Sequence, residues 1–242
     1  MSYFSKSNSI KRNSIIAFDL DGTLSRSKEN ISPRMADLIN KLTINKKVVV
    51  ISGGSIEQYN KQLLPYIKNS INLIMLPLEG SERFEYSPIS KKWEMTFKKV
   101  FPVDIKKDVV DVLNRIIKSN KFGIPTVHEG AYIEDRDTEI AFSALGQNAH
   151  INEKESWDPD HKKRDKIKKI IEKEVPNVTV TIAGTTTIEV LPKGWNKAVG
   201  LNYYLKESGF NIDDVVFVGD AIYPGGNDYP ISQLNIKSYK VN

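Results

Sequence analysis

The sequence predicts an α/β protein: a core built on a mainly parallel sheet, with a second, α+β segment inserted into it. Short apolar runs alternate with helical patterns near both ends of the chain, an order typical of βαβ units. Between them the strand candidates alternate polar and apolar residues, which indicates half-buried antiparallel strands. We therefore expect a discontinuous core of residues 1–84 and 188–242 and an inserted domain of residues 85–187.

The first half of the core contains three apolar runs that are typical of buried strands, separated by two helices. Ser32 and Pro33 supply an N-cap and a first helical residue for the first helix. Ser55 and Gln58 form a capping-box pattern at the start of the second helix, which is predicted to extend to about Lys68. The strands are predicted at residues 14–18, 47–51 and 73–76.

The inserted segment and the end of the chain carry a different set of signals. Two helical patterns lie among half-buried strands in the insert, and the βα pattern returns after Gly194. The predicted elements are helices near residues 106–118, 160–174 and 196–207, and strands at residues 131–134, 139–142 and 215–218.

Composition excludes several classes of protein. The chain has no cysteine, which excludes disulfides and thiol catalysis. No run approaches the ~18 apolar residues of a membrane helix, and residues 1–14 lack the apolar middle of a signal peptide. A cytoplasmic protein is the simplest interpretation. The formal charge of +5 suits anionic partners, but the densest basic run, residues 161–173, has helical spacing and favours a solvated helix face.

Polar residues follow several of the predicted strands at the point where each strand ends. Asp19 and Asp21 follow the first strand, Ser52 the second and Asp220 the last, while Lys197 begins the helix before that last strand. Each residue alone has an ordinary explanation as a turn, a helix cap or a surface charge. Ligands in an open α/β sheet gather at the carboxyl ends of the strands. The joint occurrence at one edge therefore indicates an active site.

The two aspartates at the first strand suit two different steps of a phosphoryl transfer. Asp19 can attack phosphorus, while Asp21 donates a proton to the leaving oxygen and later takes one from the incoming nucleophile. Gly22 permits the tight turn between this pair and Thr23, whose hydroxyl can donate a hydrogen bond to the substrate. This spacing predicts a nucleophile and a general acid–base catalyst in one loop.

The remaining residues of this edge suit a metal ion and an anion. Asp19 and Asp220 offer the hard oxygen ligands that Mg²⁺ prefers. Ser52 and Lys197 can hold the phosphoryl oxygens by hydrogen bond and charge. The Gly53-Gly54 pair leaves backbone N–H groups open at a helix N-terminus, where anions bind.

These residues resemble the four signature motifs of the haloacid dehalogenase (HAD) superfamily of phosphohydrolases and phosphomutases. The motifs are residues 18–24, Ser52, Lys197 and Gly219-Asp220, and the resemblance covers the whole chain. It implies a Rossmann-like core with a parallel sheet, an inserted cap domain of the subclass IIB type, an aspartyl-phosphate intermediate on Asp19 and Mg²⁺ as the cofactor.

Two further segments resemble the phosphomannomutase branch of this superfamily. Residues 218–228 are similar to its metal loop, and residues 192–197 are similar to its Pro-Asp-Gly-Trp-Asp-Lys motif. The resemblance implies that the metal ligands are Asp19, Asp21 and Asp220, with Asn227 and Asp228 as secondary candidates. Relatives often dimerise through the cap, so the resemblance leaves a homodimer open.

The cap departs from the phosphomannomutase pattern where that family binds the distal phosphate with arginines. Only Arg136 stands in a matching place, while Glu129 and Gln147 occupy two arginine positions. Arg136 has an alternative interpretation, since it could pair with carboxylates within residues 134–137. Other basic anchors remain open, namely Lys154, Lys162 and Arg164. Two more substrate positions, Thr187 and Glu189, carry conservative replacements, and Lys28 stands roughly where the family has an arginine.

These departures favour a phosphatase that hydrolyses a sugar phosphate. Each lost charged hydrogen bond should weaken distal-phosphate binding by ~1.5–3 kcal/mol. A phosphomannomutase that interconverts hexose 1- and 6-phosphates is the alternative, and a non-catalytic nucleic-acid-binding module is a more distant one. We expect a small phosphorylated sugar as the partner, with no nucleic acid and no membrane.

Overall fold

The computed structural model describes residues 15–68, 70–126 and 129–241, and the predicted polar tail, residues 1–14, lies outside them. The chain forms two compact units. The core unit consists of the chain up to Thr96 and from Gly200 onward, and the inserted unit is Phe97–Val199. No helix of the described residues is long and apolar enough to cross a membrane.

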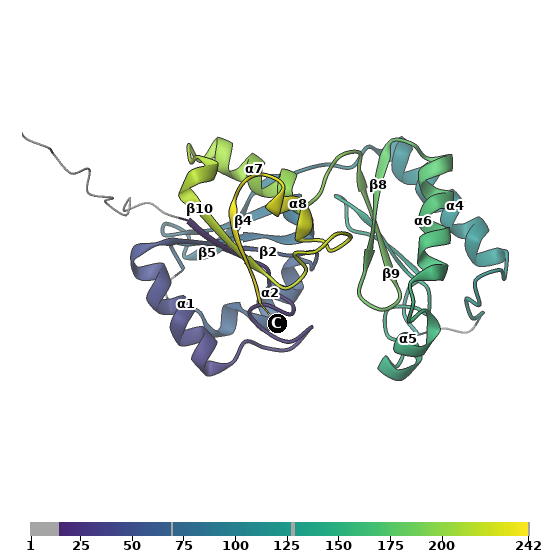
Figure 1. The fold of residues 1–242 in the computed structure, drawn as a ribbon, viewed down its shortest axis with the longest axis horizontal. Coiled ribbons are helices and arrows are strands. Elements are labelled where there is room, and N and C mark those ends of the chain that lie inside the picture. Colours follow the sequence, from purple (N-terminus) through teal and green to yellow (C-terminus); the bar gives the residue numbers. More distant parts are fainter. Residues whose placement is uncertain (1–14, 69, 127–128, 242) are drawn as a thin grey trace, which may run out of the picture. The chain divides into compact units, whose positions relative to one another are not determined.

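The core unit is built on a seven-stranded sheet whose first five strands are parallel (Figure 1). The sixth strand runs antiparallel to the fifth. Across the sheet the strands are β11 (Lys237–Lys240), β10 (Val215–Gly219), β1 (Ile15–Phe18), β2 (Lys47–Ile51), β3 (Leu73–Leu76), β4 (Glu82–Ser87) and β5 (Lys92–Lys98).

The strand order places β1 at the point where the chain changes direction across the sheet. The chain passes from β1 to β2 and β3 on one side, and β10 and β11 are added on the other side. Strands β2 and β3 are apolar and almost fully buried, as expected for parallel strands covered on both faces, while β1 and β10 alternate buried and half-buried residues. A crevice outside the carboxyl ends of β1 and its neighbours is the usual ligand site of such a sheet.

The helices of the core unit follow local signals in most places. Ser32 caps the first helix as predicted, because its Oγ accepts a hydrogen bond from the backbone N–H of Met35 at 3.2 Å. The second helix ends at Gln62, earlier than predicted, and Pro65 in the following turn has no N–H to continue it. The helical segments are α1 (Pro33–Asn45), α2 (Ile56–Gln62), η1 (Leu64–Tyr66), α3 (Pro77–Gly80), α7 (Lys197–Glu207), η2 (Ile212–Asp214) and α8 (Tyr229–Ser232).

The inserted unit is a four-stranded antiparallel sheet with helices packed on one face (Figure 1). Alternate strand residues, including Phe142, Ile188 and Val190, pack with α4 and α6 into one apolar core. The other set of alternate residues includes Thr187 and Glu189 and forms a polar face. The elements are α4 (Val103–Lys118), β6 (Ile133–Asp135), β7 (Ile140–Ser143), α5 (Ile151–Trp157), α6 (Lys162–Glu174), β8 (Val178–Ala183) and β9 (Thr187–Pro192).

The compact units change at residues 96/97 and 199/200, whereas the sequence predicted domain boundaries at 84/85 and 187/188. Two structural features account for the difference. The strands β4 and β5 extend the large sheet of the core unit, although their polar–apolar alternation resembles that of the insert. Strand β9 pairs with β7 and β8 in the inserted unit, so the insert continues beyond Thr187.

Helix α7 packs backbone against backbone on the turn that follows β3. A Cβ atom on Gly200 would lie 2.4 Å from the carbonyl oxygen of Glu79 and 2.8 Å from the Cα of Gly80. Real Cβ atoms do not approach backbone atoms so closely, so the helix can lie here only because residue 200 is glycine.

We predict that Gly200→Ala destabilises the protein by ~1–3 kcal/mol, because the added methyl group overpacks a contact between two backbones. Helix propensity alone predicts the opposite sign, a gain of about 1 kcal/mol. Urea unfolding at fixed pH measures the difference, with Lys206→Ala on the exposed side of α7 as the control. A more stable Gly200→Ala protein would contradict the packing described here.

Candidate active site

Asp19 lies at the carboxyl end of β1 because the sheet pairing continues up to it. Its backbone N–H donates to the carbonyl oxygen of Val218 at 3.0 Å, one step beyond the paired strand residues. Its side chain is buried, with the residue 4% exposed. The most central strand of the parallel sheet thus delivers a buried carboxylate to the switch point, as the sequence predicted.

Three carboxylates come together at this edge. The ligand oxygens of Asp19, Asp220 and Asp228 all lie within 4.8 Å of one another. Asp228 is fully buried, and its Oδ2 accepts a hydrogen bond from the N–H of Ala221 at 3.1 Å. Such a set of hard oxygen donors fits a divalent cation of the Mg²⁺ type.

Two glycines leave the space that these carboxylates occupy. A Cβ atom on Gly22 would lie 2.5 Å from Oδ2 of Asp220, and one on Gly219 would lie 2.3 Å from Oδ2 of Asp228. Gly22 also has a φ of +85°, which side chains rarely allow. The pattern Asp-x-Asp-Gly therefore needs its glycine both for the turn and for the approach of Asp220.

Asp21 is absent from this group among the residues that the structure describes, and amide groups bind it instead. Nε2 of Gln58 donates to its Oδ2 at 2.6 Å, and Nε2 of Gln62 donates to its Oδ1 at 3.2 Å. The backbone N–H of Lys28, an exposed residue in the left-handed region, donates to Oδ1 at 2.9 Å. The metal roles of Asp21 and Asn227 stay predictions, as does substrate binding by the Lys28 side chain.

The predicted capping box at the start of α2 is wrong. Ser55 has no side-chain capping hydrogen bond, and Gln58 turns to Asp21 rather than to the helix N-terminus. Its Nε2 donates to the Asp21 carboxylate in a charge-assisted hydrogen bond, and its Oε1, the atom that a capping box would use, lies against Gly54. The sequence analysis therefore missed that Gln58 and Gln62 of α2 bind Asp21. It had named Gln58, but only as a helix cap.

The Ser52-Gly53-Gly54 loop is fixed by the strained turn after β3. The N–H of Leu78 donates to the Gly54 carbonyl at 3.1 Å, and the N–H of Glu79 donates to the Ser52 carbonyl at 2.9 Å. Leu78 and Glu79 both adopt left-handed φ values, 51° and 56°. This conformation costs ~1–2 kcal/mol per residue, so the turn persists only because its neighbours hold it. The sequence analysis did not predict this turn.

Hydroxyl groups of the two active-site loops are available to a ligand. Oγ of Ser52 accepts from the N–H of Gly54 at 3.1 Å, so its own proton can still be donated. The buried Oγ1 of Thr23 and Oγ of Ser25 have no hydrogen-bond partner within the described chain. Thr23 was predicted to bind substrate, and Ser25 was not. Two buried hydroxyls without a partner, in the loop that follows Asp19, are consistent with an anion site.

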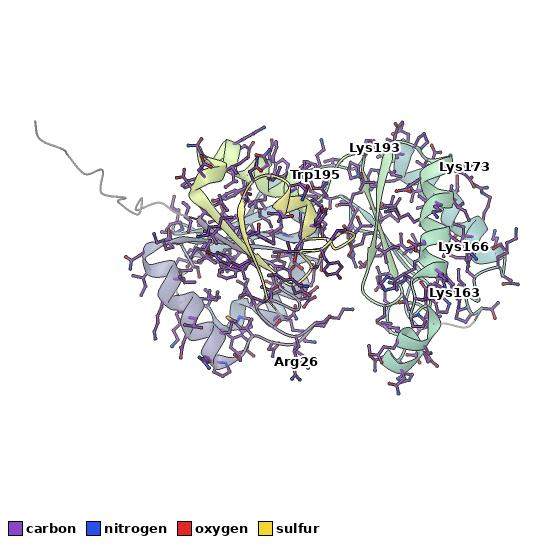
Figure 2. All side chains as sticks on the ribbon, viewed as in Figure 1. Arg26, Lys163, Lys166, Lys173, Lys193 and Trp195 are labelled. Atoms are coloured by element: carbon purple, nitrogen blue, oxygen red, sulfur yellow. The ribbon has the colours of Figure 1, made fainter. Side chains whose placement is uncertain are left out.

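Lys197 is the first residue of α7 and is fully buried. It follows a segment that is anchored within the inserted unit. Trp195 stacks on Phe97, with 6.3 Å between ring centroids, and the N–H of Gly194 donates to Oγ1 of Thr179 at 2.8 Å. Figure 2 labels Trp195 and its neighbour Lys193 in this segment. The role of Lys197 toward the phosphoryl oxygens stays a prediction.

Arg136, the one arginine that matched the family's cap, is bound by two carboxylates of the inserted unit. Its Nε donates to Oε2 of Glu134 at 2.7 Å, and Nη1 donates to Oε1 of the fully buried Glu139 at 2.8 Å. Gln147 donates to the same Oε2 of Glu134 at 2.6 Å. The alternative interpretation of Arg136, pairing with nearby carboxylates, is therefore confirmed, although its partners extend to Glu139.

Glu189 lies on the polar face of β9 and is buried. Burial and the negative charge of Glu139 raise its pKa from 4.5 to about 8, and the positive charges of Arg136 and Lys197 oppose this change only in part. Its carboxyl group therefore keeps its proton at neutral pH. Thr187 lies two residues earlier on the same face.

Comparison with known proteins identifies the class to which this fold and site belong. The model of the haloacid dehalogenase-like hydrolases matches residues 16–231, so the chain belongs to this family of hydrolases. The predicted superfamily and fold class are confirmed.

The similar proteins among curated sequences are phosphomannomutases. The enzyme of Spinacia oleracea is 27% identical over 226 residues, covering 90% of this chain and 85% of that protein. Phosphomannomutase 1 of Dictyostelium discoideum is 29% identical over 230 residues, covering 93% and 88%. The chain is therefore similar to the phosphomannomutase branch, as predicted.

Solved structures agree on the fold. Plasmodium falciparum IMP-nucleotidase superposes with a TM-score of 0.70 at 18% identity, covering 96% of this chain and 67% of that one. A haloacid dehalogenase-like hydrolase from Bacteroides thetaiotaomicron gives a TM-score of 0.62 at 19% identity, covering 90% and 84%. At these identities the likeness shows the fold alone.

We predict that Glu189→Gln changes how stability depends on pH. Between pH 5 and 8 the unfolded chain has lost the Glu189 proton while the folded protein keeps it, so the wild-type free energy of unfolding falls as pH rises. The variant has no such proton, so its stability relative to wild type should rise through this window by up to about 1.4 kcal/mol per pH unit. Urea unfolding at pH 5, 6.5 and 8 measures it; a constant difference between the two proteins would contradict the raised pKa.

Proposed function

We propose that this hydrolase is a Mg²⁺-dependent sugar-phosphate phosphatase that passes the phosphoryl group through Asp19 to water. The observation that supports hydrolysis over isomerisation is the binding of Arg136 by Glu134 and Glu139, which leaves the inserted unit without the arginine that a distal phosphate would need. The proposed phosphoryl transfer rests on the buried carboxylates and hydroxyls at the carboxyl ends of the strands.

In the first step a carboxylate oxygen of Asp19 attacks phosphorus, and the bond from phosphorus to the leaving oxygen breaks. Asp21 gives its proton to that oxygen, so the sugar leaves as a neutral alcohol. In the second step Asp21 takes a proton from water, the water oxygen attacks phosphorus, and the bond to Asp19 breaks. The products are inorganic phosphate and the original Asp19 carboxylate.

Asp19, Asp220 and Asp228 would hold the Mg²⁺ ion in the space that Gly22 and Gly219 leave for them. When bound, the ion supplies positive charge that offsets the repulsion between the phosphate and the carboxylate nucleophile. The hydroxyls of Ser52, Thr23 and Ser25 lie in the loops that follow β1 and β2 and are suited to donate to the phosphoryl oxygens.

The two glycines after Ser52 have different parts in this proposal. The N–H of Gly54 already donates to Oγ of Ser52, so it orients that hydroxyl rather than an incoming anion. The N–H of Gly53 is the one that we assign to the phosphoryl group. Lys197 is assigned to the same group by its motif, and its charge would stabilise the transition state.

The inserted unit offers few cations that could bind a second phosphate. Of the alternative anchors, Arg164 is 1% exposed and binds Asp158 at 2.9 Å, and Nζ of Lys162 binds the same-turn Asp160 at 2.6 Å. Nζ of Lys154 donates to the carbonyl oxygen of Gln147 at 2.6 Å. A cavity of this unit, about 380 Å³, is lined by acidic and apolar residues and by His150 among the described residues. Glu129, at a former arginine position, is one of them.

A phosphomannomutase is the second candidate function, and the relatives favour it. Curated phosphomannomutases match this chain at 27–29% identity over most of their length. A mutase would have to hold the distal phosphate while the sugar turns, and Arg136 would have to leave two glutamates to do so. Breaking two charged hydrogen bonds costs ~1.5–3 kcal/mol each, which is why we favour the phosphatase.

The basic helix α6 gives little support to a nucleic-acid-binding function. Lys163, Lys166 and Lys173 lie along this helix (Figure 2). Nζ of Lys163 donates to the carbonyl oxygen of Trp157 at 2.7 Å and lies over its ring. Ion pairs with acids of the same segment engage two further lysines, Lys162 with Asp160 and Lys168 with Glu172. The cytoplasmic location and the homodimer stay predictions.

We predict that Asp19→Asn abolishes turnover, with a loss on the order of 10⁴-fold or more, because the amide is a poor nucleophile. The fold should persist, since the substitution removes one of three mutually repelling charges. Steady-state assays with p-nitrophenyl phosphate and Mg²⁺, together with thermal unfolding, test both statements. Asp37→Asn on the exposed side of α1 is the matched control; activity in Asp19→Asn near that of the control would refute the nucleophile.

A ³¹P NMR time course with mannose 1-phosphate and Mg²⁺, run with and without glucose 1,6-bisphosphate, decides between the two functions. A phosphatase releases free phosphate in both samples, and chelation of the metal by EDTA stops the release. A mutase forms mannose 6-phosphate only when the bisphosphate is present. That second result would overturn the proposal and would mean that residues of the inserted unit bind the distal phosphate after all.

A further inference from the structure

Helix α2 presents two amide groups to Asp21, one to each carboxylate oxygen. Gln58 and Gln62 are separated by four residues and so lie on one face of the helix. Nε2 of Gln58 reaches Oδ2 at 2.6 Å, and Nε2 of Gln62 reaches Oδ1 at 3.2 Å. With the N–H of Lys28 on Oδ1, the carboxylate accepts three hydrogen bonds from its own chain.

The Gln58 amide lies in the space that a side chain at residue 54 would occupy, so any residue other than glycine there would displace it. Its Oε1 lies 2.0 Å from the place that a Cβ on Gly54 would occupy. A carboxylate only accepts hydrogen bonds, so the NH₂ end of the amide must face Asp21 and the oxygen must face Gly54. The loop that carries Ser52 therefore has a notch that fits the Gln58 amide.

Gln62 fixes the second oxygen of the Asp21 carboxylate. It is fully buried, and the same Nε2 that contacts Asp21 also donates to the carbonyl oxygen of Glu29 at 2.7 Å. The segment that carries Lys28 and Glu29 is thereby tied to α2 next to Asp21. A side chain held at both oxygens has lost most of the rotational freedom that an exposed aspartate keeps.

We propose that Gln58, seated in the Gly54 notch, is a positioning residue that aims the Asp21 carboxyl group at the leaving oxygen, with Gln62 as its support. This inference rests on the proposed function, in which Asp21 transfers the proton. Proton transfer requires a donor–acceptor distance of about 2.6–3.2 Å and good alignment. Loss of alignment by about 1 Å can cost on the order of 10²-fold in rate.

The inference makes a specific statement about leaving groups. An ester whose leaving oxygen is strongly basic, such as a sugar hydroxyl, needs the Asp21 proton in the transition state. An ester with a good leaving group, such as p-nitrophenolate, departs with little help. A protein with a poorly aimed Asp21 should therefore lose activity mainly toward esters with basic leaving groups.

The test compares phenyl phosphate with p-nitrophenyl phosphate in full-length wild-type and Gln58→Met proteins with Mg²⁺. Methionine keeps the length of glutamine but donates no hydrogen bond. We expect kcat/KM for phenyl phosphate to fall ~10–100-fold, the value of a charged hydrogen bond, and kcat/KM for p-nitrophenyl phosphate to fall much less. Gln233→Met, at an exposed glutamine after α8, is the matched control and should keep the wild-type ratio.

A second variant disturbs Gln58 without replacing it. Gly54→Ala puts a methyl group into the notch and should displace the Gln58 amide, giving the same change in the ratio of the two substrates. In a Gln58→Ala background the notch is empty, so Gly54→Ala should add little further change. Thermal unfolding of each variant separates this effect from a loss of fold.

The outcomes distinguish the inference from the proposed function. An unchanged ratio in Gln58→Met, or an equal loss for both substrates, would overturn the positioning role while leaving the phosphatase intact. A wild-type protein that hydrolyses neither ester with Mg²⁺ would overturn the phosphatase and the inference with it. Strictly additive effects of Gly54→Ala and Gln58→Ala would show that the two residues act separately. That result would contradict the claim that Gly54 acts by making room for the Gln58 amide.

Discussion

The close approach of three carboxylates at one edge of a parallel sheet is the constraint on which the core unit depends. With ligand oxygens of Asp19, Asp220 and Asp228 within 4.8 Å of one another, each pair of charges repels by at least roughly 3 kcal/mol at an effective dielectric constant of about 20. The pairing of β1 with β10 forces this approach, and Gly22 and Gly219 make room for it. A bound divalent cation would offset the repulsion, so the fold supplies a site that favours one.

Much of this edge could be predicted from the sequence, because its signals are local. Asp19, Ser52 and Asp220 each follow an apolar run, and parallel strands bring such ends together without further information. The roles of Gln58 and Gln62 could not be predicted, because they depend on how α2 packs against the first loop. The spacing of Ser55 and Gln58 suited a capping box equally well, and only the position of Asp21 decides between the two.

The inserted unit was harder to predict for the same reason. Its alternating strands were recognised, but β4 and β5 show the same alternation and belong to the core sheet. The partners of Arg136 lie close to it in the sequence, two residues before and three residues after, where the chain turns from β6 to β7. The sequence showed a lone arginine among acids but not which of them bind it. In the structure Glu134 and Glu139 bind Arg136, whereas the adjacent Asp135 and Asp137 bind Lys106 and Lys98.

The protonated carboxyl group of Glu189 has a consequence for the kind of molecule that its side of the sheet can accommodate. An ionised glutamate only accepts hydrogen bonds, but a group with a pKa of about 8 offers a donor and an acceptor together at neutral pH. In that state it behaves like the amide of a glutamine and carries no charge to repel. The sugar that we propose as the substrate has hydroxyl groups that also donate and accept, so a side chain in this state would suit it.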